Sequence, residues 1–323
     1  MLHILRILPN YEFSWLAHDI LPFVRFSYMT QVTQPTIPLF IPDDWKDYEL
    51  IDSGDGGKLE RFGTYTIARP DPRAIWQISA PKEVWDNADA LYIRANKDSG
   101  DWQIKRPPPE PWIVHYDKIA FTLKPTSFKH VGIFPEQAVN WRWMTDLING
   151  KFPNVLNLFA YSGGATLAAA AAGAKVTHVD SAKSAITWAR ENAIASHLAN
   201  APIRWIVDDA YKFAQREARR GVKYDAIIMD PPRFGRGTQG EVWKLEENLP
   251  KLLTVCKELL SPKPLFILIN AYTADMSSVV VERLLSDLTR GLGGQVSLAE
   301  LALKETASGR LLPSGICARW QAR

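Results

Sequence analysis

The spacing of hydrophobic and polar positions changes near residue 154. From there, short apolar runs alternate with stretches that repeat at the helical period. The apolar runs predict strands over 155–159, 176–179, 203–207, 226–229, 265–269, 296–303 and 316–320. The periodic stretches predict helices over 163–172, 182–197, 210–220, 249–260 and 277–288, the fourth with Pro250 in its first turn. This alternation predicts an α/β fold, a mainly parallel sheet covered by helices on both faces.

The chain before residue 113 follows a different pattern, rich in proline, aromatic and β-branched residues. Short strands are expected over 64–68, 90–94 and 113–116, the last leading on to residue 123. We therefore expect a small β-rich domain over 36–112. Residues 1–35 are apolar and aromatic and are interpreted as a flexible N-terminal arm, with a natural start at Met29 as the alternative.

Composition is that of a globular protein, with 46% apolar and 23% charged residues. The net charge of +3 is too small to indicate nucleic-acid binding, although a local basic face remains open. The two cysteines, Cys256 and Cys317, have no metal-ligand spacing, and we expect no metal site and a reducing compartment. No apolar run reaches the roughly 18 residues of a membrane span, so no transmembrane helix is expected. With the reducing compartment, we expect a cytoplasmic protein.

Candidate chemistry begins after the first strand of the second half, because ligands of open α/β sheets bind beyond the carboxyl ends of strands. The turn there reads Ala160-Tyr161-Ser162-Gly163-Gly164. Its paired glycines allow a close approach of backbone to ligand, since no Cβ intervenes. Ser162 is a candidate N-cap of the next helix. A plain turn is the competing interpretation.

Carboxylates follow the next two strands. Asp180, followed by Ser181, can accept hydrogen bonds from ribose hydroxyls or cap the following helix. Asp208, Asp209 and Ala210 follow the third strand, where a carboxylate could accept from an adenine amino group or cap a helix instead. Together, the glycine turn after the first strand and the carboxylates after the second and third strands favour a nucleoside site. The turn lacks both the G-x-G-x-x-G and the Gly-Lys-Ser/Thr patterns, so the site is not built for phosphates.

The fourth strand runs into Asp230-Pro231-Pro232-Arg233-Phe234. Two prolines directly after a central strand end the hydrogen-bond ladder and stiffen the turn. The Asp230 carboxylate and the Pro231 carbonyl are then free to hold an amino group or a base edge. These residues are the candidate point of group transfer.

Together these stretches resemble the class I S-adenosylmethionine-dependent methyltransferases. The matching motifs lie at 157–165, 178–181, 207–210 and 229–234. The resemblance implies a Rossmann-like seven-stranded methyltransferase sheet over 113–323 and S-adenosyl-L-methionine as cofactor. It also implies that Asp180 binds the ribose, Asp209 the adenine and the 160–164 turn the methionine moiety, with 230–233 facing the substrate.

More narrowly, the chain is similar to the bacterial large-subunit ribosomal RNA methyltransferases that act on cytosine carbon five or guanine nitrogen seven. That branch carries a K-T-G-(aromatic)-(aromatic)-x-D-Q segment, and 130–137 of this chain keeps the glycine, second aromatic, acid and glutamine in type. The implied cofactor-binding residues are Phe134, Gln137, Ala160, Tyr161, Ser162, Gly163, Gly164, Asp180, Ser181, Asp209, Ala210 and Asp230. The implied catalytic residues are Asp230, Pro231, Pro232 and Arg233.

One departure narrows the chemistry. Methylation of cytosine carbon five needs a thiolate that adds to the ring, and relatives place that cysteine just after strand five. Here residues 269–273 read Ile-Asn-Ala-Tyr-Thr, and both cysteines lie elsewhere, in expected core positions. A nitrogen acceptor needs no covalent step, so the sequence favours transfer to a nitrogen, with guanine as the first candidate.

The substrate stays open between three hypotheses. The first is transfer to an RNA base, in ribosomal RNA by the resemblance, with phosphate contacts from basic residues that follow the third and fourth motifs. Those residues are Lys212, Arg216, Arg219, Arg220, Lys223, Arg233 and Arg236. A solvated helix face is the competing interpretation of the first five. The second hypothesis is a small-molecule or protein methyltransferase, and the third a non-catalytic nucleic-acid-binding protein.

Overall fold

The computed structural model describes residues 37–95, 99–237, 240–272 and 276–323. The arm expected over 1–35 lies outside these residues. Residues 37–323 form one compact unit. None of the described helices is long and apolar enough to cross a membrane.

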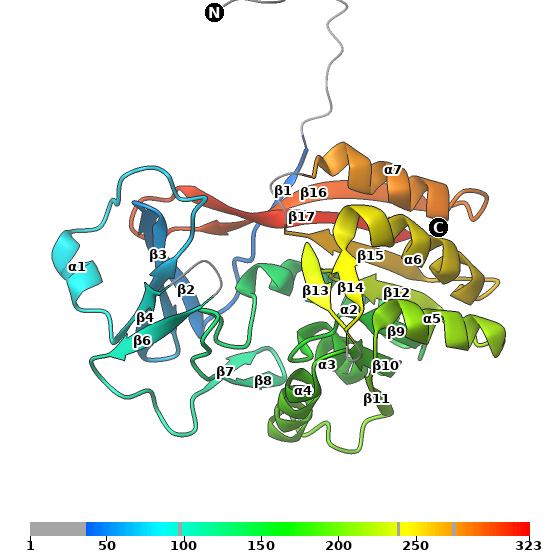
Figure 1. The fold of residues 1–323 in the computed structure, drawn as a ribbon, viewed down its shortest axis with the longest axis horizontal. Coiled ribbons are helices and arrows are strands. Elements are labelled where there is room, and N and C mark those ends of the chain that lie inside the picture. The colour runs from blue at the N-terminus through cyan, green and yellow to red at the C-terminus, as the bar shows by residue number, and fades with distance from the viewer. Residues whose placement is uncertain (1–36, 96–98, 238–239, 273–275) are drawn as a thin grey trace, which may run out of the picture. The chain divides into compact units, whose positions relative to one another are not determined.

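An α/β sheet forms the larger part of this unit (Figure 1). Within the described residues it has eight strands, in the order β1-β16-β17-β15-β12-β9-β10-β11. The seven expected strands are present, as β9 (Asn154–Leu158), β10 (Lys175–Asp180), β11 (Ile203–Val207), β12 (Ala226–Met229), β15 (Phe266–Ala271), β16 (Gln295–Lys304) and β17 (Leu311–Gln321). A short eighth strand, β1 (Leu39–Phe40), pairs with β16. Among these described strands, β17 alone runs antiparallel to its neighbours.

Helices cover both faces of the sheet, as the alternation predicts. They are α2 (Ala138–Ile148), α3 (Gly164–Ala171), α4 (Lys183–Ala195), α5 (Ala210–Arg219), α6 (Leu245–Leu259) and α7 (Ser278–Leu288). One core lies under α5, α6 and α7, and a second packs α2 and α3 against the opposite face. The second core is continuous with a further sheet formed by the first third of the described chain.

That further sheet has five strands within the described residues. They are β2 (Tyr48–Gly54), β3 (Gly57–Phe62), β4 (Tyr65–Pro70), β5 (Ala90–Arg94) and β6 (Gly100–Ile104), with the short helix α1 (Lys82–Asp86) before β5. A separate hairpin, β7 (Ile113–Tyr116) and β8 (Ile119–Thr122), lies against α4. The sequence pattern identifies β4, β5 and this hairpin but not β2, β3 or β6.

The hairpin between β16 and β17 ties the two sheets together, as Figure 1 shows at the left. Leu50 of β2 forms a β-bridge with Glu305, at the tip of the hairpin. The buried Glu305 carboxylate accepts from Ser53 and from Arg310, whose guanidinium also lies 3.3 Å from Asp52. Buried charges are tolerated when they are paired in this way, so the tip is fixed on the β-rich sheet.

Two helix assignments differ from the expectation. α6 begins at Leu245, four residues early, and Pro250 therefore lies inside the helix and not in its first turn. Leu245 and Leu249 are both buried, and this packing outweighs the backbone bond that the proline removes. The sequence pattern does not predict α2, although this helix forms one whole wall of the second core.

Candidate active site

The site lies where strand order reverses. β9 has β10 on one side and β12 on the other, so the connections leave the sheet in opposite directions and open a crevice at the strand ends. A partly open cavity occupies this crevice. Its lining residues are Ile133, Phe134, Gln137, Trp141, Asn157, Phe159, Ala160, Tyr161, Ser162, Gly164, Ala165, Ile228, Asp230, Leu268 and Asn270.

The turn after β9 is wound into an unusual backbone conformation. Phe159, Tyr161 and Gly163 all have positive φ, at 56°, 47° and 90°. Non-glycine residues rarely adopt this region, and such strain concentrates at functional sites. The result is that the turn curls around the cavity and leads directly into α3.

The prediction that Ser162 caps α3 is wrong. The cap position is Gly163, no side chain hydrogen-bonds the first turn, and the Ser162 hydroxyl donates to the Gly132 carbonyl instead. Gly163 can be the cap because its left-handed φ suits glycine. The first N–H groups of α3 are thereby left for a ligand, and Gly164 and Ala165 line the cavity.

Gly164 is a glycine for a reason that the sequence does not reveal. A Cβ at this position would lie 2.5 Å from Cζ2 of Trp141, which closes the cavity from α2. The close approach that the structure shows is therefore made by a protein side chain, and the expected approach of a ligand to this turn stays a prediction. Gly163 is less crowded, since a Cβ there would lie 3.0 Å from the Ala189 side chain, and its positive φ is what requires glycine.

Asp180 ends β10 and holds the turn through its two oxygens. It accepts from the backbone N–H of Tyr161 at 2.8 Å and of Ala182 at 2.9 Å. Burial raises the pKa of this carboxyl, although the backbone N–H groups oppose the shift. Asp180, the residue expected to bind the ribose, thus holds the turn that lines the cavity. Neither Asp180 nor Ser181 lines the cavity itself.

Asp209 takes the capping role that the sequence left open. Its carboxylate accepts from the Lys212 N–H at 2.9 Å at the start of α5. The neighbouring Asp208 forms an ion pair with Arg216. Asp209 and Ala210 do not line the cavity, so the structure brings the first-motif turn and Asp230 together but leaves the expected adenine contacts outside.

Asp230 lies at the cavity wall, directly after β12. Burial raises the pKa of its carboxyl to about 8, and the nearby Glu136 adds to the shift. Near neutral pH this group therefore holds a proton that a neighbouring cation would release. Such a poised carboxyl is typical of functional sites.

The three residues after Asp230 differ in burial. Pro231 is buried, whereas Pro232 and Arg233 are exposed, and none of the three lines the cavity. The Pro232 carbonyl accepts from the Trp243 indole at 2.7 Å, which fixes the turn against the hairpin of β13 (Phe234–Arg236) and β14 (Val242–Lys244). Of the four expected catalytic residues, only Asp230 faces the cavity.

Sequence reasoning missed a buried polar network behind the cavity. The Asn140 amide donates to Gln137 at 2.7 Å and to Asn270 at 3.0 Å, and Arg319 donates to the Asn140 oxygen at 2.9 Å. Gln137 in turn donates to the Tyr272 hydroxyl. The only signal is an asparagine within an apolar strand, as at Asn270, because polar groups are buried only when they are paired.

Four of the five basic residues after the third motif form contacts with described residues of the chain. Arg216 contacts Asp208, and Arg220 contacts Glu217 at 3.1 Å. Lys212 contacts Glu241, and the Lys223 ammonium donates to the Glu258 carbonyl at 2.6 Å. These contacts fit the solvated helix face better than a ligand surface. The side chain of Arg236 lies outside the described part of the chain.

Comparison with known proteins identifies the family to which this chain belongs. Residues 87–284 match the model of the family described as S-adenosylmethionine-dependent methyltransferase. The chain belongs to this family. A methyltransferase structure from Agrobacterium tumefaciens, described as SAM-dependent, superposes with a TM-score of 0.85 at 42% identity, over 89% of this chain and 96% of that one. The protein is therefore a methyltransferase whose cofactor is S-adenosyl-L-methionine. Its fold is a Rossmann-like sheet with an N-terminal β-rich region.

Curated relatives match smaller parts. The ribosomal RNA large subunit methyltransferase K/L of Shewanella frigidimarina is 34% identical over 152 residues, which cover 46% of this chain and 21% of that protein. The ribosomal RNA large subunit methyltransferase I of Aeromonas salmonicida is 25% identical over 205 residues, 60% of this chain and 48% of that protein. The methyltransferase thus spans between a fifth and a half of these relatives. A methyltransferase solved with SAH shares the fold, with a TM-score of 0.66 at 22% identity.

The cavity has the groups that this cofactor needs. The open N–H groups of α3 suit a carboxylate, since a helix N-terminus carries partial positive charge. The Asp230 carboxyl suits a positively charged neighbour, and the aromatic rings of Phe134 and Tyr161, 5.8 Å apart, give an apolar wall. The residues present therefore fit a zwitterionic ligand with a sulfonium centre.

Proposed function

We propose that this methyltransferase transfers a methyl group to a nitrogen of an RNA base, in ribosomal RNA, with guanine as the first candidate. The observation that carries the proposal is Asp230, a carboxyl acceptor poised at the cavity where the fourth strand ends. A cytoplasmic location agrees with such a substrate. The twelve cofactor-binding residues expected from the sequence remain part of this proposal, with Gly163, Asp180, Ser181, Asp209 and Ala210 acting from outside the cavity wall.

S-adenosylmethionine supplies a methyl group on a positively charged sulfur. The acceptor nitrogen provides the electron pair for the new nitrogen–carbon bond, and the pair of the breaking carbon–sulfur bond stays on sulfur. The Asp230 carboxylate holds the acceptor by a hydrogen bond, stabilises the positive charge that develops on nitrogen, and takes up its proton where the acceptor is an amine. Phe134 and Tyr272, whose rings lie 5.8 Å apart, offer stacking surfaces for a base.

The cysteines support a nitrogen acceptor. Cys256 and Cys317 are both fully buried, and burial raises the pKa of the first thiol to about 12 and of the second to about 11. A nucleophilic cysteine needs the opposite shift, because the thiolate is the reactive form. Tyr272 stands in the segment after β15, where carbon-five enzymes carry their cysteine.

Cys256→Ala and Cys317→Ala are therefore expected to keep kcat within about threefold of the wild type, since a thiolate step would cost orders of magnitude more. The measurement is the initial rate of methyl transfer at 25 °C, after a melting curve has shown each variant to be folded. A thousandfold loss of kcat in a folded variant would restore the thiolate route.

The RNA assignment is tested by label transfer. Wild-type protein and S-adenosylmethionine labelled in the methyl group are incubated with total RNA from a strain that lacks the protein. We expect label in large-subunit ribosomal RNA, and nuclease digestion should yield a nucleoside methylated on nitrogen. Label confined to small molecules or to protein would support the second candidate, a non-RNA methyltransferase, and absence of cofactor binding by calorimetry would support the third, a non-catalytic protein.

A further inference from the structure

A group of cations lies on the face of the β-rich sheet that packs against the methyltransferase core. Lys58 of β3 and Arg69 of β4 are direct cross-strand partners, so two positive side chains stand opposite each other. Like charges in this position repel and are uncommon without compensation. Arg73 and Lys129 join them, and we call Lys58, Arg69, Arg73 and Lys129 the cation cluster.

Two carboxylates compensate the cluster only in part. Glu60 accepts from Arg69 at 2.5 and 3.0 Å, and Asp71 accepts from Arg73 at 2.8 and 2.6 Å. Four cations thus face two carboxylates within the described residues. Counting the buried Glu136, which is within electrostatic range of Lys58 and Arg73, still leaves one positive charge in excess.

The excess positive charge lies on side chains whose N–H groups are not all used in hydrogen bonds to described residues, namely Lys58 and Arg73. Lys58 is 8% exposed and has Glu60 at 3.4 Å and Asp71 at 3.8 Å, but its ammonium makes no hydrogen bond to a described residue. Arg73 binds Asp71 through Nε and Nη2, and its side chain is 37% exposed. The Lys58 ammonium is therefore paired electrostatically with two carboxylates but keeps N–H donors that an oxyanion could use, and a buried charge is stabilised by such hydrogen bonds.

The Lys129 ammonium lies in the same positive field. It donates to the Pro70 carbonyl at 2.9 Å, and Arg69 donates to the Lys129 carbonyl at 3.1 Å. Burial lowers the pKa of Lys129 to about 8, and the other three members of the cluster add to the shift against the opposing effect of Asp71. A further positive neighbour is thus disfavoured here, and a negative one is favoured.

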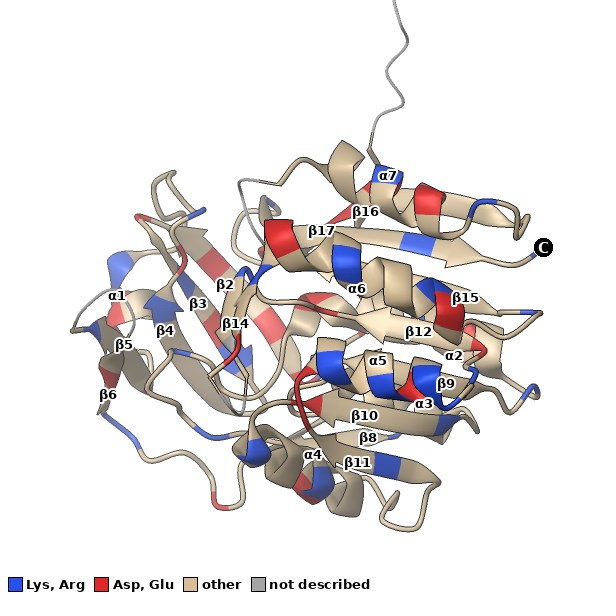
Figure 2. Cartoon of the chain, turned by 45° about the vertical axis from the view of Figure 1, so that its right-hand side comes forward, with Lys and Arg blue, Asp and Glu red and all other residues tan. Residues whose placement is uncertain are grey.

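The cluster adjoins the cavity. Lys129 begins the segment that continues through His130, whose ring lies 5.2 Å from that of Phe134 in the cavity wall. Arg73 is within electrostatic range of Glu136 and of the Tyr272 hydroxyl, and Tyr272 is in range of Asp230. Figure 2 shows acidic and basic segments together on β2–β4, beside the strands that end at the site.

We propose that the cation cluster binds a phosphate of the RNA backbone next to the methylated nucleotide, with Arg73 as its exposed contact. This inference rests on the proposed function, and it gives the β-rich sheet a task, which is to position the substrate. An arginine fork held by Asp71 presents its remaining N–H groups in a fixed orientation, as phosphate recognition requires. The cofactor's carboxylate is the other oxyanion within reach, and the test separates the two.

The test compares Arg73→Gln with wild type in three measurements. Binding of large-subunit ribosomal RNA to the protein saturated with S-adenosylhomocysteine is followed by anisotropy at several salt concentrations, S-adenosylmethionine affinity by calorimetry, and folding by a melting curve. We expect RNA affinity to fall about tenfold, the size of one charged hydrogen bond, and the slope of log K against log salt to fall by about one. The affinity for S-adenosylmethionine should not change.

Two further variants make the result specific. Arg61→Gln removes a charge from the opposite face of β3, where Arg61 pairs with Glu49 at 2.8 Å, and should leave the salt slope unchanged. Arg73→Lys keeps the charge and should restore the slope.

The remaining outcomes each contradict the phosphate site. Weaker S-adenosylmethionine binding with unchanged RNA binding would assign the cluster to the cofactor's carboxylate. A lower melting temperature alone would make it a structural ion network. If wild-type protein methylates no RNA, the proposed function fails; if it does and Arg73→Gln binds RNA normally, only the phosphate site fails.

Discussion

An Asp230→Ala variant is expected to lose about a hundredfold or more in kcat, which is the cost of removing one preorganised electrostatic contact from a transition state. The side chain lies at the cavity wall and its deletion removes the acceptor nearest to the proposed transfer point. Loss of packing does not explain such an effect, because the residue as a whole is only partly buried. The measurement is single-turnover methyl transfer with saturating cofactor, together with a melting curve.

The pH dependence makes this prediction specific to the ionised group. Because the pKa of Asp230 is raised to about 8, the carboxyl is protonated below that pH and ionised above it. Activity that needs the carboxylate should therefore rise with pH, and kcat/KM for S-adenosylmethionine, which reports the protein before the cofactor binds, should show an apparent pKa near 8. Bound S-adenosylmethionine, through its positive sulfur, should lower this value, whereas S-adenosylhomocysteine, which lacks that charge, should not.

Two matched variants control for other groups. Asp230→Asn keeps a carbonyl acceptor but cannot ionise, so we expect intermediate activity and loss of the limb near pH 8. Glu136→Gln removes the negative neighbour that adds to the shift and should move the limb to lower pH. An Asp230→Asn variant that retains the wild-type limb would show that another group titrates.

The parts of this site that the sequence predicts are those that follow a strand. Asp180 and Asp230 are identifiable because each comes directly after an apolar run, and parallel strands end at one edge of a sheet. Their positions follow from local pattern alone. Roles that depend on a partner far along the chain are assigned wrongly, as at Ser162, whose hydroxyl binds Gly132, 30 residues away.

The buried polar network around Asn140 could not be predicted from the sequence, because its partners lie far apart along the chain. Asn140 contacts Asn270 and Arg319, which are 130 and 179 residues away, and no periodicity reveals such a pairing. The same holds for the β-rich sheet, where Ser53 meets Glu305 across 252 residues. Individual polar residues in apolar strands indicate that partners must exist, but only the three-dimensional packing identifies them.

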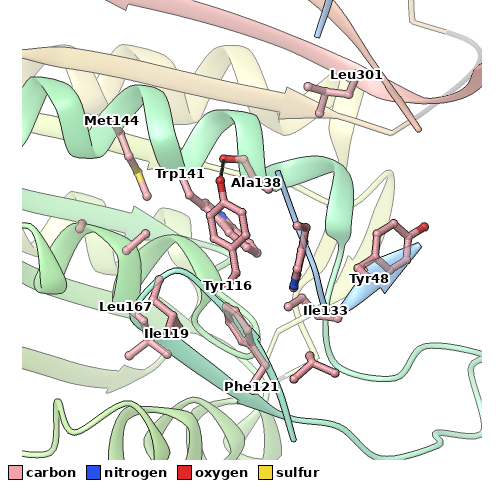
Figure 3. Packing of buried hydrophobic residues seen from close by; sticks show 14 of the residues in the cluster. Tyr48, Tyr116, Ile119, Phe121, Ile133, Ala138, Trp141, Met144, Leu167 and Leu301 are labelled. Carbon is pink, nitrogen blue, oxygen red and sulfur yellow. Dashed lines mark hydrogen bonds between the residues drawn. The ribbon is translucent and has the colours of Figure 1, made fainter. Parts of the chain in front are cut away.

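Trp141→Ala is expected to destabilise the fold by about 3–5 kcal/mol, the usual cost of removing a buried aromatic side chain. Trp141 is 4% exposed and stacks on Phe121, with ring centroids 5.4 Å apart, and the ring centroids of Trp45 and Tyr116 lie at 5.9 and 5.6 Å. Figure 3 shows Trp141 packed beside Tyr116 and Phe121. Its ring also touches Gly164 and lines the cavity, so cofactor affinity should fall with stability. Urea denaturation and calorimetry measure the two effects.

A Gly164→Ala variant then tests whether contact between this ring and the cofactor turn causes the coupling. Glycine to alanine normally stabilises a helix by about 1 kcal/mol, but here the new Cβ would lie 2.5 Å from Trp141, and overpacking costs about 1–3 kcal/mol. We expect a net loss of stability, and Trp141→Phe in the same chain should recover part of it because the smaller ring makes room. Additive effects of the two substitutions, measured as a double-mutant cycle, would refute the contact. A non-additive change in the free energy of unfolding would show that Trp141 of α2 and the turn at Gly164 are in energetic contact.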